Sequence, residues 1–160
     1  MRRTPMIALG AAALLAGPLN GPVAAAREPV PCPGTVTGVV QTLVKAEQRG
    51  DRTLLEFEFT AKHTLCPAPN ESVEADQIGR LWFNLDAAGT GRVRFASTVH
   101  YEGATLQGDG GGTVTSSGIT GTGRAYGGTG SLAGIQGRGE FWSTGPDSFA
   151  DLIWYLYPRA

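Results

Sequence analysis

Fifteen glycines fall between Gly103 and Gly145, and short segments of alternating apolar and polar residues lie between and before them. Their spacing is irregular and interrupted by threonine, leucine and tyrosine, which excludes both a collagen triplet and a flexible linker. Alternation with a period of two is typical of strands with one buried face, and no stretch after residue 26 sustains a helical period. Glycine also permits the tight bends and strong coiling of a closed sheet. The pattern therefore predicts an all-β protein.

The clearest alternation covers residues 54–65, where Leu55, Phe57 and Phe59 share one face. Short strands are expected at 35–45, 54–65, 81–86, 92–101, 113–120, 123–126, 137–143 and 149–157. A long loop is expected at 66–77, which is rich in Pro, Asn, Glu and Ser. Seven or eight strands in one domain-sized chain indicate a sandwich or a barrel. The glycines favour a single antiparallel closed barrel of about eight strands.

The first 26 residues have the parts of a secretory signal peptide. Two arginines precede an apolar run from Met6 to Ala16, and an Ala-Ala-Ala sequence ending at Ala26 offers a cleavage site. The run is too short to span a bilayer. We therefore expect a cleavable signal peptide over 1–26, one β-barrel domain over 27–160, no transmembrane anchor in the mature form, and secretion from the cytoplasm.

Both cysteines, Cys32 and Cys66, follow this predicted signal peptide. Two cysteines in an exported domain most simply form one disulfide. Flanking prolines place both of them in stiff, non-helical connections. With no Cys-x-x-Cys pair and only two histidines, His63 and His100, the sequence predicts neither a metal site nor a cofactor.

The charge of the chain argues against one class of partner. Thirteen basic residues stand against 14 acidic ones, the formal net charge is −1, and only 17% of residues are charged. A nucleic-acid-binding domain normally carries a strongly basic face. We expect no nucleic-acid partner.

One stretch carries a family resemblance. Residues 126–141 read YGGTGSLAGIQGRGEF, which resembles the Gly-Gly-Thr/Ser-Gly…Gly-x-x-Gly segment shared by allene oxide cyclases, plant dirigent proteins and many small bacterial barrels. Upstream, YEGATLQG at 101–108 is similar to the dirigent Tyr-x-Gly-Ser-Thr-Leu turn. The aromatic tail LIWYLY at 152–157 resembles the last strand of the same families. Order and spacing agree from about Arg92 to the C-terminus.

The resemblance implies an antiparallel barrel of about eight strands around an apolar cavity, often assembled as a homotrimer. The family chemistry does not transfer with it. The cyclases carry a cavity glutamate and asparagine on early strands, and residues 35–45 contain neither. Leu132 also stands where an aromatic residue usually follows Gly-Gly-Thr-Gly-x. The catalytic residues therefore stay unknown, and an enzyme of this kind would be a cyclase or isomerase without a cofactor.

Polar residues on the predicted inward faces are the candidates for ligand contact. They are His63, Ser97, Tyr101 and Tyr155, with Tyr157 as a weaker candidate. An imidazole or hydroxyl in such a place can hydrogen-bond a ligand carbonyl or hydroxyl within an apolar pocket. Alternatively, His63 and Tyr101 lie near the barrel mouths, where their polar tips reach water. Glu56 and Glu58 share the opposite face and are expected to pair outside the barrel with Arg92 and Arg94.

The sequence is consistent with two functions. The first is an exported barrel that binds a small hydrophobic molecule in its cavity and steers a cyclisation or isomerisation through shape and orientation. The second is a non-catalytic interaction module of the cell surface or secretome, with the barrel interior filled by side chains. Phe57, Phe59, Phe83 and Phe95, all on inward faces, support the second function.

Overall fold

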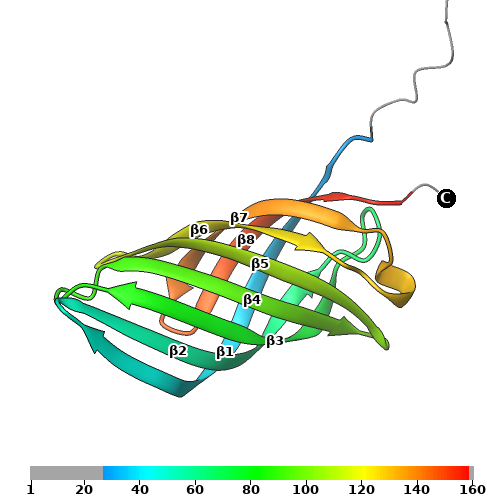
Figure 1. Ribbon diagram of the computed structural model, residues 1–160. Coiled ribbons are helices and arrows are strands. Elements are labelled where there is room, and N and C mark those ends of the chain that lie inside the picture. Colours follow the sequence, from blue (N-terminus) through cyan, green and yellow to red (C-terminus); the bar gives the residue numbers. More distant parts are fainter. Residues whose placement is uncertain (1–26, 159–160) are drawn as a thin grey trace, which may run out of the picture.

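The computed structural model describes residues 27–158, so the predicted signal peptide lies outside the described residues. Eight antiparallel strands form a closed barrel in which each strand pairs with its neighbours in sequence (Figure 1). The strands are β1 (Val30–Arg49), β2 (Arg52–Leu65), β3 (Val73–Leu85), β4 (Gly91–Tyr101), β5 (Ala104–Thr115), β6 (Gly118–Tyr126), β7 (Gln136–Gly145) and β8 (Ser148–Leu156). A single 3₁₀ turn, η1 (Gly130–Leu132), interrupts the strands within the described part. The all-β prediction and the closed antiparallel barrel are confirmed.

Within residues 27–158, no helix has the length and apolar character needed to cross a membrane.

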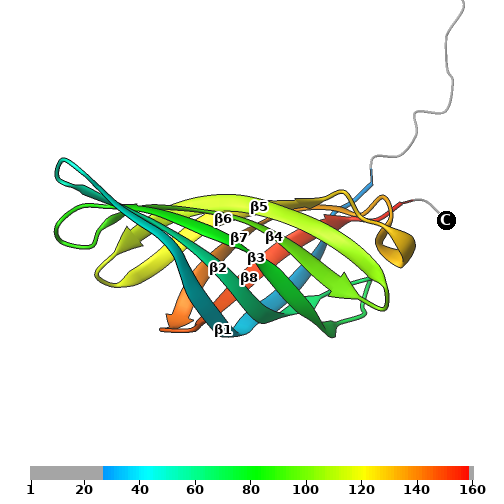
Figure 2. The ribbon, with the colours of Figure 1, turned by 60° about the horizontal axis from the view of Figure 1, so that its bottom comes forward.

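The barrel closes through the pairing of its first and last strands. Residues Val30–Val36 of β1 pair with Phe149–Tyr155 of β8. This ladder closes the sheet, so the edges of β1 and β8 that face each other are paired over these residues. From Thr37 to Arg49, β1 pairs only with β2 among the described strands, and two β-bulges bend it there. The outer part of the β1–β2 hairpin therefore extends past the closed part of the barrel (Figure 2).

The core of the barrel lies at the end that carries η1. Buried side chains from β1, β2, β4, β5 and β8 gather there around Leu132 and Ile135, which fill this end of the barrel. At the opposite end, Phe57 and Phe83 are only half-buried, with ring centroids 5.8 Å apart in an edge-to-face arrangement. The interior is therefore well packed at one end and looser at the other.

Several glycines on the inward faces provide room for aromatic rings as well as for bends. A Cβ atom added to Gly123 would lie 3.0 Å from the Phe95 ring, and one added to Gly121 would lie 2.6 Å from the Phe141 ring. Phe95 and Phe141 meet edge to face with centroids 5.5 Å apart. Glycine at these positions therefore sets how far the rings reach into the barrel.

Two of the expected elements are wrong in their bounds. The predicted loop at 66–77 ends earlier, because β3 begins at Val73 and its polar residues alternate outward with inward-facing Ala75 and Gln77. The predicted strand at 113–120 contains the turn between β5 and β6. The expected partners of Glu56 and Glu58 are also wrong. Arg80 on β3 contacts both carboxylates at 3.0 Å, since it lies directly opposite Glu58 in the ladder.

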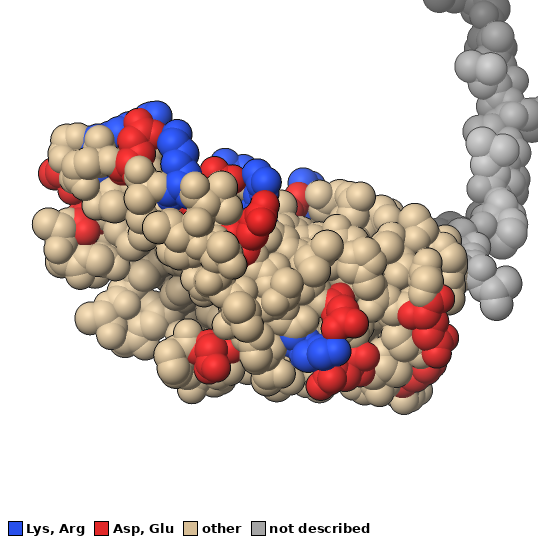
Figure 3. All heavy atoms as spheres, turned by 90° about the horizontal axis from the view of Figure 1, so that it is seen from below, with Lys and Arg blue, Asp and Glu red and all other residues tan. Residues whose placement is uncertain are grey.

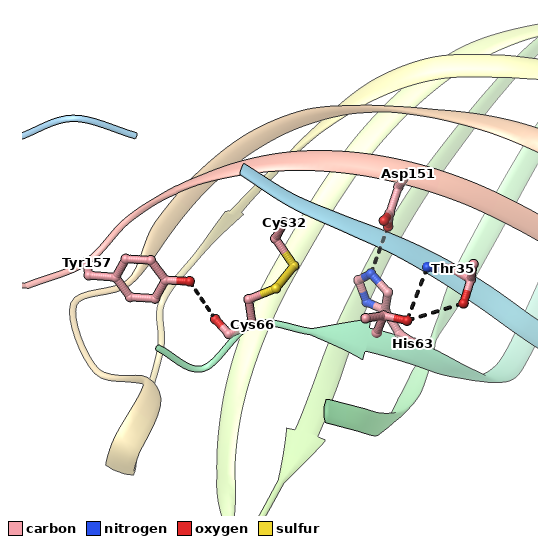
Figure 4. Close-up of a disulfide and its surroundings, with 7 residues drawn as sticks. Cys32, Thr35, His63, Cys66, Asp151 and Tyr157 are labelled. Atoms are coloured by element: carbon pink, nitrogen blue, oxygen red, sulfur yellow. Dashed lines mark hydrogen bonds and ion pairs between the residues drawn. A yellow bond between two sulfur atoms is a disulfide. The ribbon is translucent and has the colours of Figure 1, made fainter. Parts of the chain in front are cut away.

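The predicted disulfide between Cys32 and Cys66 is confirmed (Figure 4). Cys32 lies within β1 and not in a connection, and Cys66 directly follows β2. Both residues are buried in the core at the η1 end. The bridge therefore ties the strand that closes the barrel to the strand beside it.

We predict that loss of this disulfide destabilises the barrel by about 3–4 kcal/mol, because the bridge closes a loop of about 35 residues in the unfolded chain. Urea unfolding of the oxidised protein, the reduced protein and a Cys32→Ala/Cys66→Ala variant measures the loss. The variant should not respond to reductant. Equal free energies of unfolding for the oxidised and reduced protein would contradict the prediction.

Candidate functional site

A cavity of about 140 Å³ lies inside the barrel. Most of its wall is apolar and includes the rings of Phe59, Phe95, Phe141 and Phe149. An engineered cavity of about 150 Å³ with a similar lining binds benzene, whereas drug-sized ligands need at least about 300 Å³. We call this cavity the lumen; it has room for a molecule of roughly the size of a single six-membered ring.

Two buried charged or chargeable side chains meet in the lumen wall. His63 on β2 and Asp151 on β8 approach with 2.8 Å between Nε2 and Oδ2, and each side chain is 8% exposed. Figure 4 shows the two side chains pointing toward each other past β1, which lies between their strands. A carboxylate accepts a hydrogen bond, so Nε2 is the donor in this contact, and when the ring is neutral its lone pair lies on Nδ1. Nδ1 is buried and has no hydrogen-bond partner among the described protein atoms.

Gly34 on β1 makes this contact possible. It lies opposite Asp151 in the β1–β8 ladder, and a Cβ atom at this position would collide with Oδ1 of Asp151. The same Cβ would lie 3.3 Å from the Cβ of Thr64. The carboxylate therefore occupies the space that any other residue at position 34 would fill. Glycine is required here for the close approach, not for its backbone freedom.

A second polar pair lies on the neighbouring strands. The amide Nε2 of Gln77 on β3 donates to Oγ of Ser97 on β4 at 3.0 Å, and both side chains are buried. Because Ser97 accepts this bond, its own hydroxyl proton is free to be donated elsewhere. Oε1 of Gln77 is buried without a partner within residues 27–158. The pair thus presents both a donor and an acceptor at the lumen.

Tyr155 on β8 supplies a third polar group and is 1% exposed. Burial raises the pKa of its phenol, and the negative charge of nearby Asp151 raises this pKa further. The phenol therefore keeps its proton throughout the physiological pH range and can donate a hydrogen bond.

The structure places three of the four predicted site residues together. His63, Ser97 and Tyr155 all line the lumen. Tyr101 does not line it; this residue ends β4 and packs against the core at the η1 end. The hydroxyl of Tyr157, the weaker candidate, instead donates to the backbone carbonyl of Cys66 at 2.9 Å (Figure 4).

Asp151 and Gln77 also line the lumen, and the sequence analysis did not predict either of them. Asp151 alternates with Phe149, Ile153 and Tyr155, so a carboxylate on an otherwise apolar face was the available signal. Gln77 was hidden because its segment was assigned to a loop. Within the described part of the chain, no three His, Cys, Asp or Glu residues gather closely enough to hold a metal ion.

Comparison with family models, curated proteins and solved structures gave no match, so the resemblance to allene oxide cyclases and dirigent proteins stays a prediction.

We predict that Gly34→Ala destabilises the protein by about 1–3 kcal/mol, because the added methyl group displaces the Asp151 carboxylate. In a protein that already carries Asp151→Ala, the Gly34→Ala substitution should cost less stability, because the carboxylate is no longer there to be displaced. The difference between the two costs, the coupling free energy, should be about 0.5–3 kcal/mol. Urea unfolding of the four proteins in this cycle gives the value. Additive effects of the two substitutions would show that the carboxylate does not occupy the space beside Gly34.

Proposed function

We propose that this protein is an exported barrel whose lumen binds a small, mainly apolar molecule that carries a polar atom. The observation that carries the proposal is the set of three unpartnered polar atoms in the lumen wall, Nδ1 of His63, Oε1 of Gln77 and Oδ1 of Asp151. A buried polar group without a hydrogen bond costs about 1–3 kcal/mol, so a bound hydroxyl group, which can donate to such an acceptor, would relieve part of that cost. A ligand carbonyl would instead accept a hydrogen bond from the Ser97 hydroxyl. The apolar rings around these atoms favour a ligand that is otherwise hydrocarbon.

The charged residues of the lumen lining indicate which class of ligand the lumen can hold. Arg124 contributes to the lumen lining, but its guanidinium is directed outward to Asp109, with Nε 2.8 Å from Oδ1. Inside the lumen, Asp151 adds a carboxylate. A buried anion is stable only beside a cation or hydrogen-bond donors. The lumen therefore favours neutral molecules over carboxylates and phosphates.

The disulfide supports the proposal of export. Disulfides persist in secreted and periplasmic proteins and are rare in the cytosol. The Cys32–Cys66 bridge agrees with the signal peptide predicted for residues 1–26. A closed eight-stranded barrel is also the fold that the resemblance to allene oxide cyclase and dirigent barrels implies.

We predict that the purified protein binds cyclohexanone and benzene in the lumen. Ala125→Leu should weaken both by at least about tenfold, because Ala125 lines the lumen and the larger side chain fills it. Ala96→Leu is the matched control, since Ala96 is exposed on the outer face of β4. NMR titration of backbone amides, with circular dichroism as a check of folding, measures the affinities. The proposal fails if neither probe binds the wild-type protein, or if Ala125→Leu binds both probes normally.

A second candidate function uses the outside of the barrel. From Val40 on, β1 pairs only with β2 among the described strands, and this segment carries three exposed apolar residues, Val40, Leu43 and Val44, with exposed fractions of 63%, 54% and 49%. Charged side chains gather in separate patches and leave much of the surface in Figure 3 uncharged. An apolar strand edge pairs readily with another strand. The favoured occupant is the same β1 segment of a second copy, because a two-fold axis would place the two edges antiparallel.

We predict that a Val40→Lys/Val44→Lys variant sediments as a smaller species than the wild-type protein, because charge on a strand edge opposes pairing. Thr113→Lys on β5 is the control, since Thr113 is exposed on a strand that is paired on both sides. Analytical ultracentrifugation over a range of concentrations gives the oligomeric state. A wild-type protein that is monomeric throughout would exclude this function.

A further inference from the structure

We propose that His63 and Asp151 form a proton-transfer dyad that moves the double bond of a small unsaturated ketone or aldehyde held in the lumen. This inference rests on the proposed binding function, because the substrate must first enter the lumen. The dyad is the one hydrogen-bonded pair of buried ionisable side chains among the described residues. It also lies in the wall of the lumen.

The imidazole of His63 has the properties of a general base. Its Nε2–H is held by Asp151 at 2.8 Å, which leaves the lone pair of Nδ1 available. When Nδ1 accepts a proton, the adjacent carboxylate stabilises the imidazolium that forms. The apolar wall reduces competition from water and strengthens these interactions. His63 is thus the catalytic residue, and Asp151 is a positioning residue.

Two hydroxyl groups can stabilise the charge that develops on the substrate oxygen. Burial and the charge of Asp151 hold the Tyr155 phenol in its protonated form. The hydroxyl of Ser97 already accepts from Gln77 and can donate its own proton. Donors fixed in place before reaction are the most effective means of stabilising an oxyanion.

The reaction balances without any other reagent. Nδ1 of His63 removes a proton from the carbon between the carbonyl group and the double bond. The electrons of that C–H bond form a new carbon–carbon double bond, and negative charge moves to the carbonyl oxygen. The N–H then returns the proton to the far carbon of the original double bond. One C–H bond breaks and one forms, and the double bond becomes conjugated with the carbonyl group.

The geometry argues against hydrolysis by a nucleophilic serine. A serine nucleophile needs a hydrogen bond to its base. Ser97 bonds to Gln77, and within residues 27–158 His63 bonds only to Asp151 through its side chain. Proton transfer to and from carbon needs no such nucleophile.

The test uses cyclohex-3-en-1-one, a single-ring ketone matched to the lumen, and follows the ultraviolet absorbance of its conjugated isomer, cyclohex-2-en-1-one. We expect wild-type protein to accelerate this reaction above the rate in buffer. His63→Gln should lower the rate by about 10²–10⁴-fold. His100→Gln is the matched control, because His100 is exposed on the outer face of β4 and should leave the rate unchanged.

The Asp151→Asn variant tests whether the Asp151 carboxylate positions His63 and stabilises its imidazolium. It should lower kcat by at least about tenfold while KM changes little, because the amide no longer stabilises the imidazolium but leaves the lumen shape intact. Asp109→Asn is the control, since this carboxylate lies on the outer wall beside Arg124. If the Asp151→Asn variant does not fold, the Gly34→Ala variant takes its place in the test. Its added methyl group displaces the same carboxylate and should also lower kcat.

The outcomes separate the two proposals. Wild-type protein that binds cyclohexanone but does not isomerise cyclohex-3-en-1-one overturns the dyad and leaves the binding function standing. Catalysis that persists in His63→Gln also overturns it. Wild-type protein that binds benzene but not cyclohexanone overturns the dyad alone, and failure to bind either probe overturns both proposals.

Discussion

The ladder between β1 and β8 is the contact that gives this protein an interior. It joins the two ends of an eight-stranded meander, and without it the chain would form an open, curved sheet with two free edges. It also sets the distance between β2 and β8, so that His63 and Asp151 can meet past Gly34. The Cys32–Cys66 bridge holds the same part of β1 to the end of β2. Closure and the buried polar pair therefore depend on one short segment of the first strand.

The size of the lumen follows from a balance between rings and glycines. Phe95, Phe141 and Phe149 extend inward, and Phe141 meets each of the other two rings edge to face. Gly121 and Gly123 accept these rings where a side chain would collide with them. The remaining space is about 140 Å³, which is too small for a long-chain lipid and suitable for one ring. The interior is thus intermediate between the open cavity and the filled barrel considered from the sequence.

Much of the fold could be predicted because strand alternation and cysteine count are local signals. Residues 54–65 and 92–101 read as strands with the correct faces, which placed His63 and Ser97 inside. Asp151 was missed because its partner is 88 residues away and their contact depends on barrel register. The polar composition of 66–77 hid Gln77, because outward residues of a strand are as polar as a loop. The role of Gly34 depends on a neighbouring strand and has no signature in the sequence.

The protonation of the His63 ring tests most directly whether the barrel holds a base ready for reaction. The chain has two histidines, so a nitrogen–proton correlation NMR spectrum of the imidazoles can be assigned with one His100→Gln sample. In the neutral ring we expect a slowly exchanging proton on Nε2 of His63 and none on Nδ1. A proton on Nδ1, or a ring that exchanges with water as rapidly as that of His100, would contradict the buried dyad.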